Sequence, residues 1–332
     1  MKHPARLRAA IALPVAVFVI GTLAVPASWA QSYPTKPVRI IVPWPPGAAL
    51  DTIVRAMAND LTARWNQPVL VDNRAGAGST IGAAAAAQAS PDGYTLMATP
   101  INPTVVASRF MYKALAFDPD RSFAPISLLA QSSQVIVVHP SIPANSLREL
   151  IELARRQPQK LNYGSWGDGS QPNLVFELIK KRENVSITHV PYKGIAPVVT
   201  AAIAGEIQLT TGSPGTVAGL VKAGKLKPIS VAGPRHAPEL PGVPTVAESG
   251  YPYAQATVRF GLFAPAGTPA AVIERIHRDV VAVLRTPAFT QKYLTANGFQ
   301  LVASGPDELA AAIREDVALV GEMIRAAGIK PE

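Results

Sequence analysis

Short runs of branched aliphatic residues alternate with longer amphipathic stretches, and this alternation limits the possible folds more than any other feature of the chain. Residues 38–42, 69–72 and 94–98 have the length and composition of buried strands. Residues 49–65 and 81–89, which lie between them, have the pattern of helices. Strands separated by helices of this length pair in parallel, so the sequence predicts an α/β fold.

The same alternation returns in the middle of the chain and then changes. Further strands are expected at 135–138, 161–164, 187–190, 207–210, 228–232 and 258–263, and residues 233–250 are expected to be irregular because they are rich in Pro and Gly. Three last helices, beginning near Pro269, Pro287 and Pro306, have no sheet of their own to cover. The simplest packing returns them to the first sheet.

Two lobes joined by two crossover strands follow from this order of elements. We predict a periplasmic-binding-protein fold of the Venus flytrap, type II-like, kind, in which the two crossovers form a hinge. Lobe 1 is expected to comprise residues 31–131 and 256–332, and lobe 2 residues 132–255. The chain has 332 residues, which is comfortable for two lobes of ordinary size.

The N-terminus has the pattern of a secretory signal peptide at residues 1–30. Three basic residues among the first eight precede an apolar stretch at 9–25, and Ser28 and Ala30 supply the small residues of a cleavage site. We expect cleavage after Ala30 and export to the periplasm. The alternative is an uncleaved anchor, but the apolar stretch is short for a span of ~20 residues.

Charge and composition limit the kinds of partner that the protein can bind. The chain has 31 basic and 22 acidic residues, which gives a formal charge of +9. Without the three basic residues of the signal peptide, 28 basic residues remain and the charge is +6. This excess suits an anionic ligand or membrane surface. Aromatic residues make up 6% of the chain and no basic stripe interleaves with them, so no nucleic-acid partner is expected.

Signatures of catalysis and of cofactors are missing from the sequence. There is no cysteine, and the five histidines are scattered without metal-ligand spacing, so we expect no metal and no cofactor. Residues 74–82 imitate a dinucleotide fingerprint, but the third glycine comes one residue late. Ser165 and Ser170 have no histidine nearby in the sequence, so we predict that the protein is not an enzyme.

Two loops between a strand and a helix are the main candidates for a binding site. Residues 43–51 contain a stiff Pro-Pro-Gly turn, and residues 164–170 contain three glycines and two hydroxyls. Ligands bind at the carboxyl ends of strands in open α/β sheets, and a helix N-terminus offers free N–H groups to a carboxylate. Tyr192 and Lys193, in a third loop, are further candidates. Each loop has a structural alternative, namely a tight connection or a flexible turn.

Several short motifs share a common order and spacing with a known family. They are Tyr-Pro-Thr-Lys-Pro-Val-Arg at 33–39, Pro-Pro-Gly at 45–47, Asn-Arg-Ala-Gly-Ala-Gly at 73–78, Pro-Asp-Gly-Tyr-Thr-Leu at 91–96, Leu-Asn-Tyr-Gly-Ser at 161–165, His-Val-Pro-Tyr-Lys-Gly at 189–194, Pro-Thr-Val-Ala-Glu at 244–248 and Ala-Pro-Ala-Gly-Thr-Pro at 264–269. Across essentially the whole mature chain, this sequence resembles the periplasmic receptors of tripartite tricarboxylate transporters, also called Bug receptors.

The resemblance implies that the two lobes close on a small organic acid whose carboxylates are held by residues around 44–51 and 165–170, largely through backbone amides and ordered waters. The expected ligand-binding set is Trp44, Pro46, Gly47, Ala48, Asp51, Ser79, Thr99, Ser165, Trp166, Gly167, Asp168, Gly169, Ser170 and Tyr192. The chain departs from the family at Ala48, where a second glycine is usual, and at Asn173, where a histidine often stands.

The expected partners are the ligand and the membrane transporter subunits, and the protein is expected to be a monomer. One alternative is a receptor of the same fold that presents its ligand-bound form to a sensor protein. Another is a periplasmic hydrolase built on this scaffold.

Overall fold

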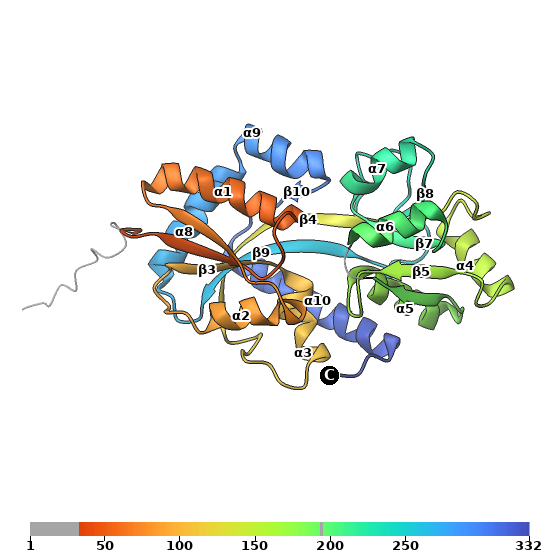
Figure 1. The fold of residues 1–332 in the computed structure, drawn as a ribbon, viewed down its shortest axis with the longest axis horizontal. Helices are drawn as coiled ribbons and strands as arrows, with labels where there is room; N and C mark the ends of the chain where they lie inside the picture. The colour runs from red at the N-terminus through yellow and green to blue at the C-terminus, as the bar shows by residue number, and fades with distance from the viewer. Residues whose placement is uncertain (1–32, 193–194, 332) are drawn as a thin grey trace, which may run out of the picture.

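Two long antiparallel strands, β4 (Phe123–Val138) and β9 (Thr257–Pro265), join the two halves of the molecule (Figure 1). The computed structural model describes residues 33–192 and 195–331, and the predicted signal peptide and Lys193 lie outside this part. β4 pairs with β9 from Phe123 to Ser133, and its last residues pair with strands of the second lobe. One continuous sheet therefore runs through both lobes.

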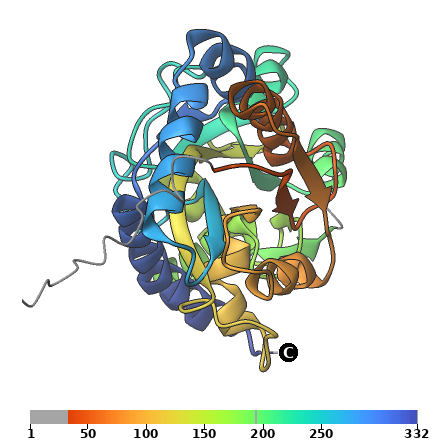
Figure 2. The same cartoon turned by 90° about the vertical axis from the view of Figure 1, so that its left-hand side faces the viewer.

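The first lobe contains the parallel strands β2-β1-β3, followed in the sheet by β9 and β4. Its elements are β1 (Val38–Val42), α1 (Ala49–Trp65), β2 (Val69–Asn73), η2 (Ala77–Ser79), α2 (Thr80–Ala87), β3 (Thr95–Pro100), η3 (Asn102–Val106), α3 (Ser108–Met111), α8 (Ala270–Leu284), α9 (Pro287–Phe289), η4 (Thr290–Leu294), η5 (Thr295–Asn297), β10 (Gln300–Leu301) and α10 (Pro306–Ala327). Figure 2 looks at this lobe end-on, with its helices arranged around its strands.

The second lobe contains β7, β5 and β6 in that order beyond β4, and β8 also pairs with β4. Its elements are α4 (Leu147–Arg156), β5 (Asn162–Ser165), α5 (Gln171–Glu183), β6 (Thr188–Pro191), α6 (Ile195–Ala204), β7 (Leu209–Gly212), α7 (Pro214–Lys222) and β8 (Lys227–Ala232). β5 is parallel to both β6 and β7, so the carboxyl ends of these strands share one edge.

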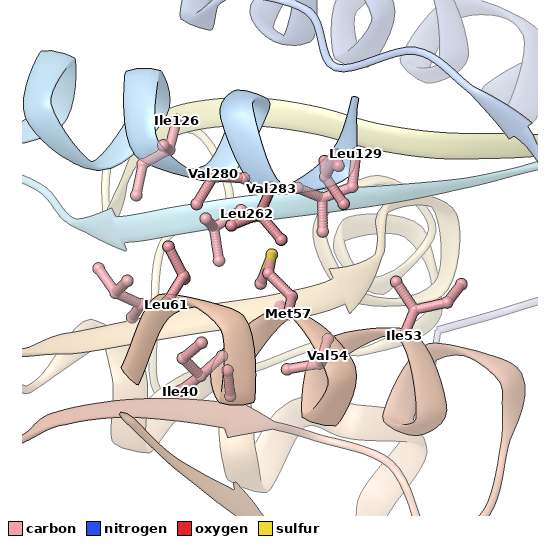
Figure 3. Packing of buried hydrophobic residues seen from close by; sticks show 14 of the residues in the cluster. Ile40, Ile53, Val54, Met57, Leu61, Ile126, Leu129, Leu262, Val280 and Val283 are labelled. Atoms are coloured by element: carbon pink, nitrogen blue, oxygen red, sulfur yellow. The ribbon is translucent and has the colours of Figure 1, made fainter. Parts of the chain in front are cut away.

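The core of the first lobe explains why α1 forms where it does. Ile53, Val54, Met57 and Leu61 recur at helical spacing and are fully buried, or nearly so. They pack with strand residues such as Leu262 and with one face of α8, as Figure 3 shows. The burial of this apolar stripe fixes the helix against the sheet and so fixes the position of its N-terminus.

A buried carboxylate links α1 to α8. Asp279 accepts hydrogen bonds from Arg64 Nε at 2.9 Å, Trp65 Nε1 at 2.8 Å and Arg275 Nε at 2.6 Å. Burial disfavours the charged form, but these hydrogen bonds and the charge of Arg275 outweigh it and hold the pKa of Asp279 below its usual value. The pair of helices is thereby fixed in register by a charged cluster as well as by packing.

The predicted two-lobed α/β fold with two crossover strands is confirmed, with local differences. β4 begins at Phe123, well before residue 135, because its first half pairs with β9 over a long distance in sequence. Thr268 followed by Pro269 has the sequence pattern of a capping residue and a first helical proline, but the Thr268 hydroxyl donates to Pro265 O at 2.8 Å and Pro269 occupies the cap position of α8. The lobe boundaries at 131 and 255 stay a prediction.

α10 contacts more than the first lobe, to which the last helices were assigned. Its Glu322 forms an ion pair with Arg182 of α5 in the second lobe. Among the described residues, no helix combines the length and the apolar character that a membrane span requires.

Candidate functional site

The loop between β1 and α1 exposes its backbone at the carboxyl edge of the first sheet. Pro46, Gly47 and Ala48 are all exposed, and α1 begins at Ala49 without a hydrogen bond from a capping side chain. Gly47 has φ +88°, and a Cβ atom placed on it would meet nothing within 4 Å. A glycine is required here by conformation, and the backbone beside it faces open space.

Asp51 lies below this loop and fixes its shape. The residue is 3% exposed and accepts hydrogen bonds from Gly47 N at 3.0 Å, Arg55 Nε at 3.0 Å and Asn73 Nδ2 at 2.9 Å. Burial raises the pKa of Asp51, but the hydrogen bonds from Arg55, Gly47 and Asn73 outweigh it and the net pKa is lowered. The oxygens of this carboxylate are therefore already occupied by the protein.

The loop between β2 and α2 lies beside the first one and is strained. β1 and β2 are parallel neighbours, and Asn73 Nδ2 also donates to Trp44 O at 3.1 Å, which ties the two loops together. Four consecutive residues, 76–79, have positive φ, including the non-glycine residues Ala77 at 43° and Ser79 at 85°. Non-glycine residues in this region cost about 1–3 kcal/mol each, and such strain gathers at functional sites.

A chain of buried hydroxyls supports this strained loop. Ser79 Oγ lies 2.8 Å from Thr104 Oγ1, which lies 2.6 Å from Thr99 Oγ1, and all three side chains are buried. Ser79 occupies the cap position of α2, yet its hydroxyl does not cap that helix. The first N–H groups of α2 are therefore left without a side-chain acceptor.

The glycine-rich loop of the second lobe lies between β5 and α5. Gly167 has φ +119°, and a Cβ atom there would also meet nothing within 4 Å. Ser170, at the cap position of α5, donates its hydroxyl to Gly167 O instead of capping the helix. By contrast, Ser146 and Ser213 cap α4 and α7 in the ordinary way.

Asn173 holds the same loop from inside. Its Oδ1 accepts from Gly169 N at 2.9 Å, and its Nδ2 donates to Tyr163 OH at 3.0 Å. The residue is 3% exposed. Its amide thus supports the loop through both of its polar atoms.

Ser165 has a histidine beside it, which the sequence did not indicate. Ser165 Oγ lies 2.6 Å from His189 Nε2, and His189 Nδ1 lies 3.6 Å from Asp168 Oδ1. The residue types match those of a hydrolase triad. However, Ser165 is completely buried and its Oγ also accepts from Gly167 N at 3.1 Å, so the hydroxyl belongs to the internal structure of the loop.

Neighbouring residues at the end of α3 bring loops of the two lobes together. Tyr112 OH donates to Ala77 O at 3.2 Å in the first lobe. A Cβ atom placed on Gly169 of the second lobe would lie 3.1 Å from Met111 Sδ. The β2–α2 loop and the glycine-rich loop therefore border the same short segment.

The aromatic candidates occupy different environments. Trp44 and Trp166 are both half-buried, and Trp44 packs partly against the first-lobe core. The Trp44 Nε1 atom is shielded from solvent and has no hydrogen-bond partner among the described residues. Tyr192 is half-buried, and its backbone N donates to Ser165 O at 2.8 Å.

Sequence reasoning missed four residues that organise these loops: Asn73, Thr104, Asn173 as a support, and His189. His189 is the first residue of the His-Val-Pro-Tyr-Lys-Gly motif at 189–194, which was the only available signal for it. The others are ordinary polar residues whose contacts follow no periodic pattern in the sequence. No group of three or more His, Cys, Asp or Glu side chains placed to hold a metal ion is found among the described residues.

Comparison with known proteins places the chain in a family. Residues 53–329 match the model of the tripartite tricarboxylate transporter family receptor. A protein from the tcbD–tcbE intergenic region of Pseudomonas sp. strain P51 is 34% identical over 84% of this chain and 83% of its own length. BugT of Bordetella pertussis is 30% identical over 93% of this chain and 94% of its own.

Solved structures agree with this assignment. A structure of Rpa4515 from R. palustris with adipate is 31% identical, with a TM-score of 0.79, and the match covers 90% of this chain and all of that one. MatC from Rhodopseudomonas palustris with bound malate is 27% identical, with a TM-score of 0.75 and coverage of 88% and 100%. The sequence, the fold and these matches together show that this chain belongs to the tripartite tricarboxylate transporter receptor family, the Bug receptors, whose members are periplasmic binding proteins.

Proposed function

We propose that the protein is a periplasmic receptor that captures a small organic carboxylate between its lobes, releases it unchanged and delivers it to a tripartite tricarboxylate-type transporter. The signal peptide at residues 1–30 would carry it across the inner membrane. The site comprises the loops at 44–51, 76–80 and 165–170, with Thr99 and Tyr192 beside them.

The observation that carries this proposal is the arrangement of three helix N-termini. The cap position of α1 holds Ala48, and those of α2 and α5 hold Ser79 and Ser170, whose hydroxyls are bonded elsewhere. At α1 and α5 the N–H groups of the first turn have no capping side chain, and together with the helix dipoles they are left for an outside acceptor; at α2 the N–H of Thr80 already donates to Ala77 O, so α2 contributes its dipole and the later N–H groups of its first turn. A carboxylate is an acceptor of suitable size and charge.

Two arginines near these loops already have acidic partners. Arg55 pairs with Asp51 at 3.0 Å, and Arg74 pairs with Asp72 at 2.8 Å. Neither arginine is therefore unpaired and available to bind a ligand carboxylate. Recognition by backbone N–H groups is therefore favoured over recognition by an arginine, and the adipate and malate bound to related proteins are acids of the expected class.

We further propose that Trp44 and Trp166 line opposite sides of the ligand. Each lies in one of the two main loops, one per lobe, and each keeps part of its indole exposed. Indole faces in such positions suit a flat or elongated acid, so an aromatic carboxylate stands beside the C4–C6 dicarboxylates as a ligand class.

A calorimetric titration with adipate, malate, benzoate and nicotinate tests the proposal, with glucose and lysine as controls. We expect at least one acid to bind and to be recovered unchanged after incubation, and neither control to bind. Binding of a control but of no acid would refute the proposal. A ligand at a hundred times its Kd stabilises by about 2.7 kcal/mol, so the melting temperature gives a second readout.

Three Trp residues remain after residue 30, so fluorescence can locate the ligand. We expect the ligand-induced change to fall in Trp44→Phe and Trp166→Phe. Trp65→Phe is the control, because Trp65, the last residue of α1, is buried and its Nε1 donates to Asp279 of α8. An unchanged signal and affinity in the double variant W44F/W166F would refute the Trp pair and leave the backbone part of the site standing.

A further inference from the structure

Ser165 Oγ is the centre of a small hydrogen-bonded cluster under the glycine-rich loop. It lies 2.6 Å from His189 Nε2, and it is 3.1 Å from both the N and the O atoms of Gly167. The Gly167 peptide is the part of the loop that borders open space. The hydroxyl therefore connects a ring on the neighbouring strand to the backbone that we place against the ligand.

His189 is held firmly on its own side of this cluster. It lies opposite Tyr163 in the parallel pairing of β5 and β6, and the two rings stack with centroids 4.8 Å apart and planes at 16°. The charged groups that act on the ring are Asp168, Glu177 and Lys180. Burial, assisted by Lys180, lowers the pKa of His189 against the opposing effect of Asp168 and Glu177.

A lowered pKa makes the neutral ring the main form at pH 7, and the positions of its neighbours favour one tautomer. A proton on Nδ1 faces the Asp168 carboxylate, 3.6 Å away, which favours that placement. Nε2 is then the acceptor for the Ser165 hydroxyl. The remaining lone pairs of Ser165 Oγ are free to accept Gly167 N–H, as the 3.1 Å contact requires.

We propose that His189 is a positioning residue of the ligand loop. Its contact with Ser165 fixes the orientation of the Gly167 peptide. Its Nδ1–H group attracts the Asp168 carboxylate and keeps it away from an entering anion. This inference rests on the proposed function and adds to it a reason why an acidic residue is tolerated in a loop that receives carboxylates.

A double-mutant cycle on ligand affinity tests the connection. Ser165→Ala, His189→Phe and the double variant are titrated with whichever of adipate, malate, benzoate or nicotinate the wild-type protein binds. Phe keeps a ring to stack on Tyr163 and removes both nitrogens. We expect each single variant to bind about tenfold more weakly, and the double variant to bind no more weakly than the weaker single one, because one chain of contacts is cut twice.

Two further variants separate positioning from general damage. His139→Phe is the matched control, because His139 Nδ1 lies 2.7 Å from Ser141 Oγ in the same lobe, outside the site, and we expect unchanged affinity. Asp168→Asn in the His189→Phe background is expected to restore part of the affinity, because it removes a carboxylate that His189 no longer holds. A purely structural role of His189 gives no such rescue.

The outcomes distinguish a failure of the proposed function from a failure of the positioning role. If the wild-type protein binds none of the acids, the proposed function is wrong. If it binds one and H189F binds equally well, or if the effects of S165A and H189F simply add, the positioning role is wrong. Should H189F fail to fold, S165A and His189→Gln carry the test: S165A is expected to weaken binding and H189Q to keep more affinity than S165A, and equal binding by all three proteins overturns the inference.

Discussion

Replacing Asp51 by Asn tests whether the first loop is held from beneath by a charge. Asn keeps the size of the side chain but has one acceptor oxygen where Asp51 has two. In place of the second oxygen it has an NH2 group, which would face a hydrogen-bond donor. Asp51 is 3% exposed and accepts hydrogen bonds from Gly47 N, Arg55 Nε and Asn73 Nδ2 at 2.9–3.0 Å. At least one of these hydrogen bonds must break.

The expected loss of folding stability follows from the strength of hydrogen bonds to a charged group. A hydrogen bond to a charged group contributes about 1.5–3 kcal/mol. The contribution of Arg55 is discounted, because its side chain is 48% exposed and solvent screens the pair. We therefore expect the free energy of unfolding to fall by about 3 kcal/mol at pH 7. For a chain of this size that lowers the melting temperature by roughly 6 °C.

The pH dependence gives a second, signed test. The pKa of Asp51 is lowered in the folded protein, so its contribution is complete above the unfolded pKa of about 4 and is lost as pH falls through the folded value. D51N does not titrate in this range. The difference in unfolding free energy between D51N and the wild type should therefore be largest at pH 7 and shrink toward pH 3.

Urea unfolding of both proteins at pH 7, 5 and 3 measures this difference. Asp120→Asn is the control, because Asp120 pairs with Arg109 at the surface and its side chain is 67% exposed, so a change under about 1 kcal/mol is expected. Equal stability of D51N and the wild type at pH 7, or a difference that persists unchanged at pH 3, would refute the reasoning.

Three other predictions concern stability and processing. Asp279→Asn should lower the free energy of unfolding by about 3–5 kcal/mol, because it breaks a buried charged cluster, while calorimetry finds the ligand affinity unchanged. Ser146→Ala should cost about 1 kcal/mol in urea unfolding, because Glu149 N loses its capping partner at the start of α4; no loss would count against that cap. Mass spectrometry of the exported protein should find Gln31 at its N-terminus, and an intact segment 1–30 would contradict the signal peptide.

Much of the fold could be predicted because the signals involved are local. The apolar stripe from Leu50 to Trp65 has the helical period, and α1 occupies the predicted residues. Ser146 and Glu149 stand at the spacing of a helix start, and α4 begins there. The length of β4 could not be predicted in this way, because its first half is a strand by virtue of pairing with β9, more than a hundred residues away in sequence.

The sequence by itself indicated which connections between a strand and a helix could expose their backbone. Gly47 and Gly167 follow apolar strands and precede helices, so loops able to expose their backbone were expected at both places. Only the tertiary structure decided how those loops are held. Ser170 and Ser79 stand at the cap position of a helix, as Ser146 does, yet their hydroxyls turn to Gly167 O and Thr104. Neither hydrogen bond leaves a periodic trace in the sequence, because each acceptor or partner is a common group whose position depends on the surrounding fold. His189 reaches Ser165 only because β6 pairs with β5.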